Sequence, residues 1–252
     1  MLALFARGAV LNPYVVVLVT GWVAGCISGV VGTGASAILL PVLVWAFGPQ
    51  QAVPLMAVAA VLANLARVGL WWSEVNWRAL LLYSLPGAPA AMLGARSLLR
   101  LPANRVELAL GLFLLVMIPL RRRLQVACTR ITAWQLALAG AVIGYLTGLL
   151  FATGPLSVPA FAAYGLMKGA FLATESASSL LLYLAKAGVF GRSGALPVAL
   201  LLKGVIVGAS LMLGSAAGKR IVIGMSPERF RYAMDTVLAW GGVSLLAGAL
   251  RY

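Results

Sequence analysis

The sequence predicts an all-α, polytopic membrane protein, and three observations lead to that prediction. The first is composition: 63% of the 252 residues are apolar and only 10% are charged, whereas a soluble domain carries about 25% charged residues. The second is length, because the apolar runs supply eight to ten segments that approach the roughly 30 Å hydrocarbon thickness of a bilayer. The third is a set of ordered matches between the two halves of the chain, which predicts two copies of one helical unit.

The matches between the halves are glycines and charged positions that recur at a constant distance. Gly21, Gly25 and Gly29 are followed, 119 residues later in each case, by three more glycines. Arg67 maps onto Lys186 at the same offset. The three later glycines are Gly140, Gly144 and Gly148. Matches that occur in the same order along two halves indicate a duplication rather than a local resemblance.

The duplication divides the chain into a first transmembrane repeat at 1–120, a basic linker at 121–131 and a second transmembrane repeat at 132–252. The first repeat contains apolar segments at 13–31, 35–47, 51–72, 78–98 and 104–120. The second contains apolar segments at 132–152, 155–166, 170–190, 196–217 and 231–250. Five crossings per copy would make the repeats inverted, which we expect, whereas four crossings plus a re-entrant segment would make them parallel.

Basic residues concentrate in the short loops and give the chain a net charge of +14. Lys and Arg mark cytoplasmic loops in membrane proteins, so Arg121–Arg123 are predicted to face the cytoplasm of a multi-pass protein of the bacterial inner membrane. Contact with anionic lipid headgroups would use the same residues. Because the cations lie between apolar runs, they do not indicate nucleic acid as a partner. With only five carboxylates in the chain, the protein interior is expected to favour anions.

Residues that usually carry catalysis or bind metals are scarce. Histidine is absent, and Cys26 and Cys128 are isolated from one another, so no disulfide, metal or cofactor is predicted. A serine nucleophile needs a general base, and a histidine base is missing here. We therefore expect a protein that is not an enzyme.

The second segment of each repeat is too short to cross a bilayer comfortably, contains proline and follows a glycine-rich break. Broken segments in matching places of two halves mark the substrate site in many transporters, because helix N-termini offer N–H groups and a positive dipole end to an anion. Close helix packing is the alternative explanation for the glycines at the breaks, and it is the explanation we favour for the three-glycine motifs. The candidate binding residues at the two breaks are Gly32, Thr33, Gly34, Ser36, Thr153, Gly154 and Ser157.

A helix with three glycines at four-residue spacing, followed by a glycine-rich break and a proline-containing segment, occurs twice in this chain. This pattern resembles the TauE/SafE sulfite exporter family of membrane anion transporters over essentially the whole sequence. The resemblance implies a secondary transporter that moves sulfite, thiosulfate or an organosulfonate by alternating access. An anion channel of the same architecture is the alternative.

Arg67, Glu175 and Lys186 are ionisable residues inside predicted membrane segments, where charges are rare and usually functional. Arg67 and Lys186 occupy equivalent positions, so we expect both to bind one small-molecule anion; for Arg67, extension of its head to the lipid interface is the alternative. Glu175 is interpreted as a counter-ion or as a proton carrier. Asn64 and Tyr183, also 119 residues apart, lie one turn before the cations and are expected to add hydrogen bonds.

Overall fold

The computed structural model describes residues 12–31, 35–126, 130–150 and 153–221, together with 236, 239–243 and 245–249. Within these residues the regular structure is entirely helical, as the composition predicts. The helices are α2 (Pro13–Val31), α3 (Ala35–Phe47), α4 (Pro49–Trp71), the 3₁₀ turn η1 (Trp72–Glu74), α5 (Trp77–Leu99), α6 (Ala103–Val126), α7 (Ala133–Leu149), α8 (Gly154–Ala163), α9 (Lys168–Arg192) and α10 (Val198–Ile221).

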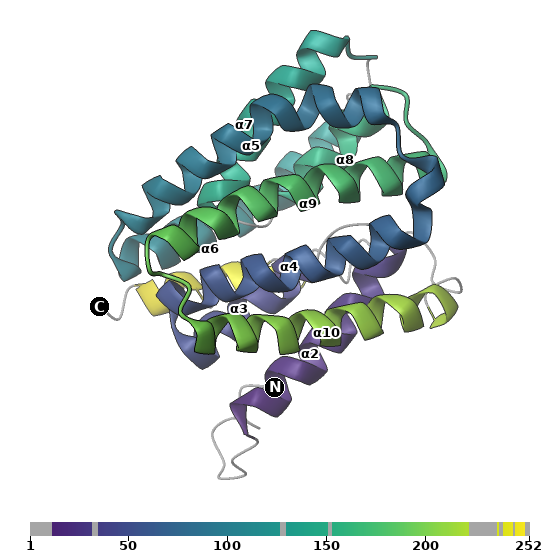
Figure 1. The fold of residues 1–252 in the computed structure, drawn as a ribbon. Coiled ribbons are helices and arrows are strands. Elements are labelled where there is room, and N and C mark those ends of the chain that lie inside the picture. The colour runs from purple at the N-terminus through teal and green to yellow at the C-terminus, as the bar shows by residue number, and fades with distance from the viewer. Residues whose placement is uncertain are drawn as a thin grey trace.

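Two long helices, α4 and α9, pack against each other in the middle of the molecule (Figure 1). On one side α5 packs on α9 and α7 packs on α5, and on the other side α10 packs on α4 and α2 packs on α10. The backbone N–H of Asn76, just after α4, binds the Thr174 hydroxyl near the start of α9 at 2.9 Å. Helices α4 and α9 therefore run in opposite directions.

Helices α3 and α8 are short, as predicted. Their 13 and 10 residues reach only about 20 Å and 15 Å at 1.5 Å per residue, which is less than the hydrocarbon thickness. The predicted segment 155–166 extends too far, because α8 ends at Ala163. Gly165, at a φ of 99°, follows this end, and the N–H of Leu166 binds the carbonyl of Phe161 at 3.1 Å. That bond closes a Schellman motif, which needs a residue in the left-handed region.

Three of the described helical stretches are both long and apolar enough to span a membrane: Pro49–Glu74, Ala103–Leu120 and Val198–Ala217. Helix α9 has the length, with 25 residues, but its Glu175, Lys186 and three serines lower its apolar character. The helical part of α6 continues to Val126, past the predicted end of that segment at 120. Arginine and leucine are good helix formers, so the first basic residues of the predicted linker extend the helix.

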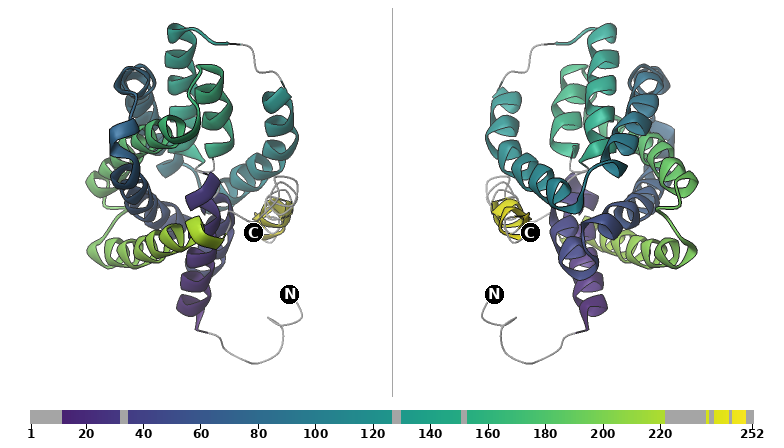
Figure 2. Two further views of the ribbon diagram at one scale, coloured as in Figure 1. Left: turned by 90° about the vertical axis from the view of Figure 1, so that its right-hand side faces the viewer. Right: turned by 90° about the vertical axis from the view of Figure 1, so that its left-hand side faces the viewer.

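The helical stretch at 239–249 lies beside α6, apart from the central layer of helices (Figure 2). A Cβ atom built on Gly111 of α6 would lie 2.9 Å from the carbonyl oxygen of Gly242. A Cβ atom on Gly241 would lie 2.7 Å from the ring of Pro41 in α3. Small residues thus bring this stretch close to α6 and to the short helix α3.

Glycines allow the backbones of the outer helix pairs, α5 with α7 and α2 with α10, to come into direct contact. A Cβ atom on Gly144 of α7 would overlap the backbone of Gly87 in α5, and one on Gly25 of α2 would overlap the carbonyl of Leu211 in α10. Gly140 and Gly148 meet the α5 backbone in the same way. These four residues therefore serve the packing role that we favour for the three-glycine motifs.

We expect Gly144→Ala to destabilise the protein. The added methyl group would overlap the Gly87 backbone, and overpacking of this kind costs about 1–3 kcal/mol. The matched control is Gly188→Ala in α9, where a Cβ atom meets no atom within 4 Å and the helix gains up to about 1 kcal/mol of propensity. Thermal unfolding in detergent measures both; equal melting temperatures for the two variants would contradict the packing role of Gly144.

Candidate functional site

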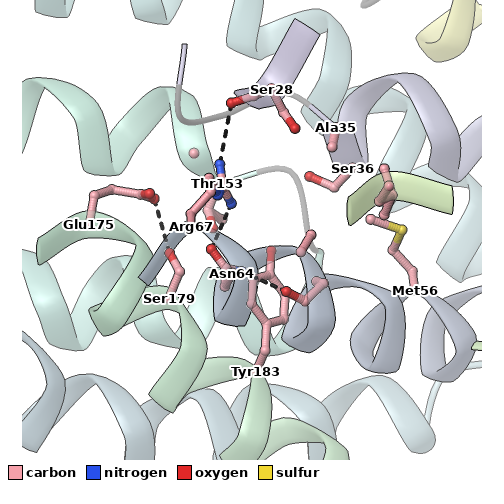
Figure 3. A pocket seen from close by; sticks show the side chains of 14 residues that line it. Ser28, Ala35, Ser36, Met56, Asn64, Arg67, Thr153, Glu175, Ser179 and Tyr183 are labelled. Carbon is pink, nitrogen blue, oxygen red and sulfur yellow. Dashed lines mark hydrogen bonds between the residues drawn. The ribbon is translucent and has the colours of Figure 1, made fainter. Parts of the chain in front are cut away.

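A cavity of about 40 Å³ lies where the two short helices begin, between α4 and α9. Its lining includes Ala35 and Ser36 at the start of α3, and Thr153 and Gly154 at the start of α8 (Figure 3). The remaining lining residues are Ser28, Met56, Ala60, Ala63, Asn64, Arg67, Glu175, Ser179, Tyr183 and Leu211. Segments far apart in the sequence thus meet at one polar cavity.

The two central helices contribute matching positions to this cavity. Met56, Ala60 and Asn64 of α4 line it from one side. Residues 119 positions later line it from α9, namely Glu175, Ser179 and Tyr183. The cavity therefore lies between corresponding faces of the two helices, but at these three positions α9 carries a carboxyl and two hydroxyl groups, whereas α4 carries only one polar side chain, Asn64.

Arg67 of α4 is 9% exposed and lines the cavity. Its Nη2 donates to Oδ1 of Asn64 at 2.6 Å, and its Nη1 lies 3.5 Å from the carbonyl oxygen of Ser28. The amide nitrogen of Asn64 donates in turn to the carbonyl of Ala60 at 2.8 Å, which fixes the amide so that its oxygen faces Arg67. The guanidinium is therefore held inside the protein, and the snorkelling alternative does not describe its position.

Lys186 of α9 is fully buried but does not belong to the lining of this cavity. Its Nζ donates to the carbonyl oxygen of Thr147 at 2.8 Å and lies 5.6 Å from the centre of the Phe190 ring. The Thr147 hydroxyl lies 2.6 Å from that of Thr153, so a short chain of polar groups connects Lys186 to the cavity wall. The structure does not bring Lys186 and Arg67 together around one enclosed space.

The two cations make equivalent contacts with the ends of equivalent helices. Arg67 and Lys186 each reach a carbonyl 39 residues earlier in the chain, and those carbonyls belong to the last four residues of α2 and of α7. Carbonyls at a helix C-terminus lack partners within the helix, and a cation there also stabilises the helix dipole. Each cation therefore caps the helix that precedes a break.

Glu175 of α9 is 3% exposed, and its two oxygens have different surroundings. Its Oε1 accepts from the hydroxyl of Ser157 in α8 at 3.1 Å and from that of Ser179 at 3.0 Å. Its Oε2 is buried without a hydrogen-bond partner among the described residues. Glu175 thus ties α8 to α9 with one oxygen and leaves the other for a further group.

Other predicted binding residues fall into three groups. Ser36, Asn64, Thr153, Gly154 and Tyr183 line the cavity. Ser157 contacts it indirectly, through Glu175. The remaining three, Gly32, Thr33 and Gly34, lie outside the described residues.

Sequence reasoning did not propose Ser28 or Ser179 for this site. Ser179 lies one helical turn after Glu175, a spacing that places two side chains on the same face, so the serine-rich run around Glu175 was the available signal. Ser28 precedes Thr147 by 119 residues, the offset of the repeat. Its contribution is a backbone carbonyl, which no side-chain pattern reveals.

A second cavity, of about 300 Å³, lies between the start of α4 and the ends of α5 and α9. Its lining is almost entirely apolar, with residues such as Val53, Leu98, Val106 and Phe190. Although this cavity is larger, it offers only one polar side chain, that of Gln50. A small, hydrated anion needs hydrogen-bond donors and positive charge, so the smaller cavity around Arg67 is the candidate site.

The long apolar helices and the polar cavity between them fit a membrane transport protein. The sequence model of the family described as sulfite exporter TauE/SafE matches residues 17–245 of the chain. The chain therefore belongs to the TauE/SafE family, as its glycine pattern suggested. No match was found among curated proteins or among solved structures.

We expect Asn64→Ala to destabilise the protein by about 1–3 kcal/mol. The substitution removes the acceptor of Arg67 Nη2 and the donor to the Ala60 carbonyl, and an unsatisfied buried group costs about that much. Asn104→Ala, at an exposed position, is the matched control and should change stability by less than about 0.5 kcal/mol. Thermal unfolding of both variants in one detergent checks this. An unchanged melting temperature in Asn64→Ala would show that Asn64 does not hold Arg67 in place.

Proposed function

We propose that this protein is a secondary transporter that moves a small sulfur-containing oxyanion, such as sulfite, thiosulfate or an organosulfonate, across the bacterial inner membrane by alternating access. The observation that carries the proposal is the polar cavity that Arg67 lines together with the starts of α3 and α8. An arginine fork suits planar or tripodal oxyanions. The N-terminal end of a helix adds partial positive charge.

Hydroxyl groups complete this binding site. Ser36 and Tyr183 line the cavity next to Arg67, and each carries an O–H group that can donate to an anion oxygen. The Ser179 hydroxyl also lines the cavity but donates to Glu175. The cavity is small, at about 40 Å³. Alternating access, in which the two halves move relative to one another, is the motion that we propose for binding and release.

We also propose that the chain is a duplication with inverted repeats at 1–120 and 132–252. The equivalent helices α4 and α9 run antiparallel through the centre, and α2 packs on α10 as α7 packs on α5 (Figure 1). Arg67 and Lys186 make equivalent contacts. These relations support a pseudo-twofold axis through the cavity.

Removal of the Arg67 charge should weaken anion binding. We expect Arg67→Met to raise the Kd for sulfite or methanesulfonate about ten- to a hundredfold, because a hydrogen bond to a charged group contributes about 1.5–3 kcal/mol. Lys186→Met removes the equivalent helix cap outside the cavity lining. It should lower the melting temperature and change the Kd by less than about threefold, since it leaves the anion's own donors in place. Binding is measured by thermal shift with sulfite, thiosulfate, methanesulfonate and chloride.

Counter-flow of labelled anion in proteoliposomes tests the transport activity itself. A transporter exchanges internal for external anion and saturates, whereas a channel shows no counter-flow. Wild-type protein that accumulates no label against unlabelled internal sulfite, thiosulfate or methanesulfonate would overturn the proposed function. Wild-type affinity in a folded Arg67→Met variant would remove Arg67 from the site.

Inverted repeats place the loop after α4 and the loop after α9 on opposite faces of the membrane. We therefore expect cysteines at Ser73 and Ser193, both exposed, to react with an impermeant maleimide from opposite sides. Cys26 and Cys128 are first replaced by alanine, and that unlabelled parent is the control. Labelling of both positions from one side would contradict the inverted arrangement.

A further inference from the structure

Glu175 is the one acidic side chain in the lining of the proposed anion site, and its geometry is that of a carboxylic acid when an anion is bound. Its Oε1 accepts from Ser179 and lies within reach of the Ser157 hydroxyl, which suits the carbonyl oxygen of a protonated carboxyl group. Its Oε2 is buried without a partner among the described residues. An ionised oxygen there would repel an anion, whereas an O–H group would supply a donor.

The charged and titratable groups around Glu175 come from three helices. Arg67 faces it from α4, Tyr83 from α5 and Tyr183 from α9 itself. Helix α8 contributes the Ser157 hydroxyl, and Tyr145 of α7 instead contacts Ser97 at 3.3 Å. Arg67 is therefore the cation that balances an ionised Glu175 when the cavity holds no anion.

We infer that the protein transports one proton together with each anion, and that Glu175 carries this proton and donates it as a hydrogen bond from Oε2 to the bound anion. The inference rests on the proposed function. When an anion enters, Oε2 takes a proton from a hydronium ion: an O–H bond forms on Glu175, one breaks on the hydronium ion, and water is released. On the other side of the membrane the anion leaves and the proton returns to water.

Charge balance gives this coupling a physical reason. Without substrate, Arg67 and ionised Glu175 sum to zero, and with a monoanion bound, Arg67, the anion and protonated Glu175 again sum to zero. Lys186 contributes equally to both states. A net charge in hydrocarbon costs several kcal/mol. The empty and the loaded protein therefore both rearrange readily when the cavity carries no net charge in either state.

Proton uptake during binding tests the inference directly. Methanesulfonate and thiosulfate are suitable probes because their own charge is constant between about pH 5.5 and pH 8.5. Calorimetric titration in buffers of different ionisation enthalpy should give an uptake of one proton per anion at the alkaline end of that range. The Kd should rise about tenfold for each pH unit there, as linkage to one proton requires.

Glu175→Gln should remove both signals. Glutamine keeps a carbonyl oxygen for the serines and places an N–H donor at the Oε2 position, so we expect a Kd without pH dependence, no proton uptake, and tighter binding than wild type at about pH 8.5. Glu107→Gln is the matched control. Glu107 is also a buried glutamate, but it contacts Gly248 of the last helical stretch and does not line the cavity, so this variant should keep the wild-type proton uptake.

Wild-type binding without proton uptake would overturn the inference and leave the proposed function standing. Proton uptake that persists in Glu175→Gln would overturn the inference as well. So would a folded Glu175→Gln variant that binds no anion, because binding would then require an ionised carboxylate. If sulfite, thiosulfate and methanesulfonate all fail to bind the wild type at every pH, the proposed function itself fails. Size-exclusion chromatography establishes that each variant is folded.

Discussion

Within hydrocarbon, each backbone N–H and C=O group must find its partner inside the protein, and the rest of this structure depends on that constraint. Continuous helices satisfy it without help. A helix that ends inside the protein does not, because its last carbonyls lack partners within the helix. Here α2 and α7 end beside the cavity, and Arg67 and Lys186 donate to carbonyls in their last turns. The two buried cations are thus a consequence of the two breaks.

The sequence predicted most helices and the position of the breaks, because both follow from local patterns. The short segment 35–47 was correct to the residue, since glycine and proline interrupt the apolar run on either side of it. The pairing of Arg67 with Lys186 followed from the offset of 119 residues. That offset identifies equivalent positions but not the direction of a side chain, so it could not show that only Arg67 lines the cavity. Nor could it reveal the Ser28 carbonyl, because backbone groups leave no trace in a side-chain pattern.

The faces that the two central helices turn towards the cavity differ in their chemistry. Met56 and Ala60 of α4 correspond by sequence offset to Glu175 and Ser179 of α9. A carboxyl on both helices would place two like charges in one small space, where at least one would stay protonated. With a single carboxyl opposite one arginine, the cavity contains one group that can change its charge, Glu175, and one that stays charged, Arg67. Arg67 can then hold the anion while Glu175 adjusts the net charge.

This division of labour also selects among anions by charge. A sulfonate carries one negative charge, which a protonated Glu175 and a cationic Arg67 bring to zero. A dianion such as thiosulfate leaves one uncompensated negative charge in the same cavity, and hydrocarbon penalises that charge while the protein rearranges. Binding and transport therefore impose different requirements on the charge of the anion. A dianion can bind Arg67 at least as strongly as a monoanion while the cavity is open to water. In the proposed transporter we therefore expect the charge of the loaded cavity, as well as its affinity, to set how fast each bound oxyanion crosses the membrane.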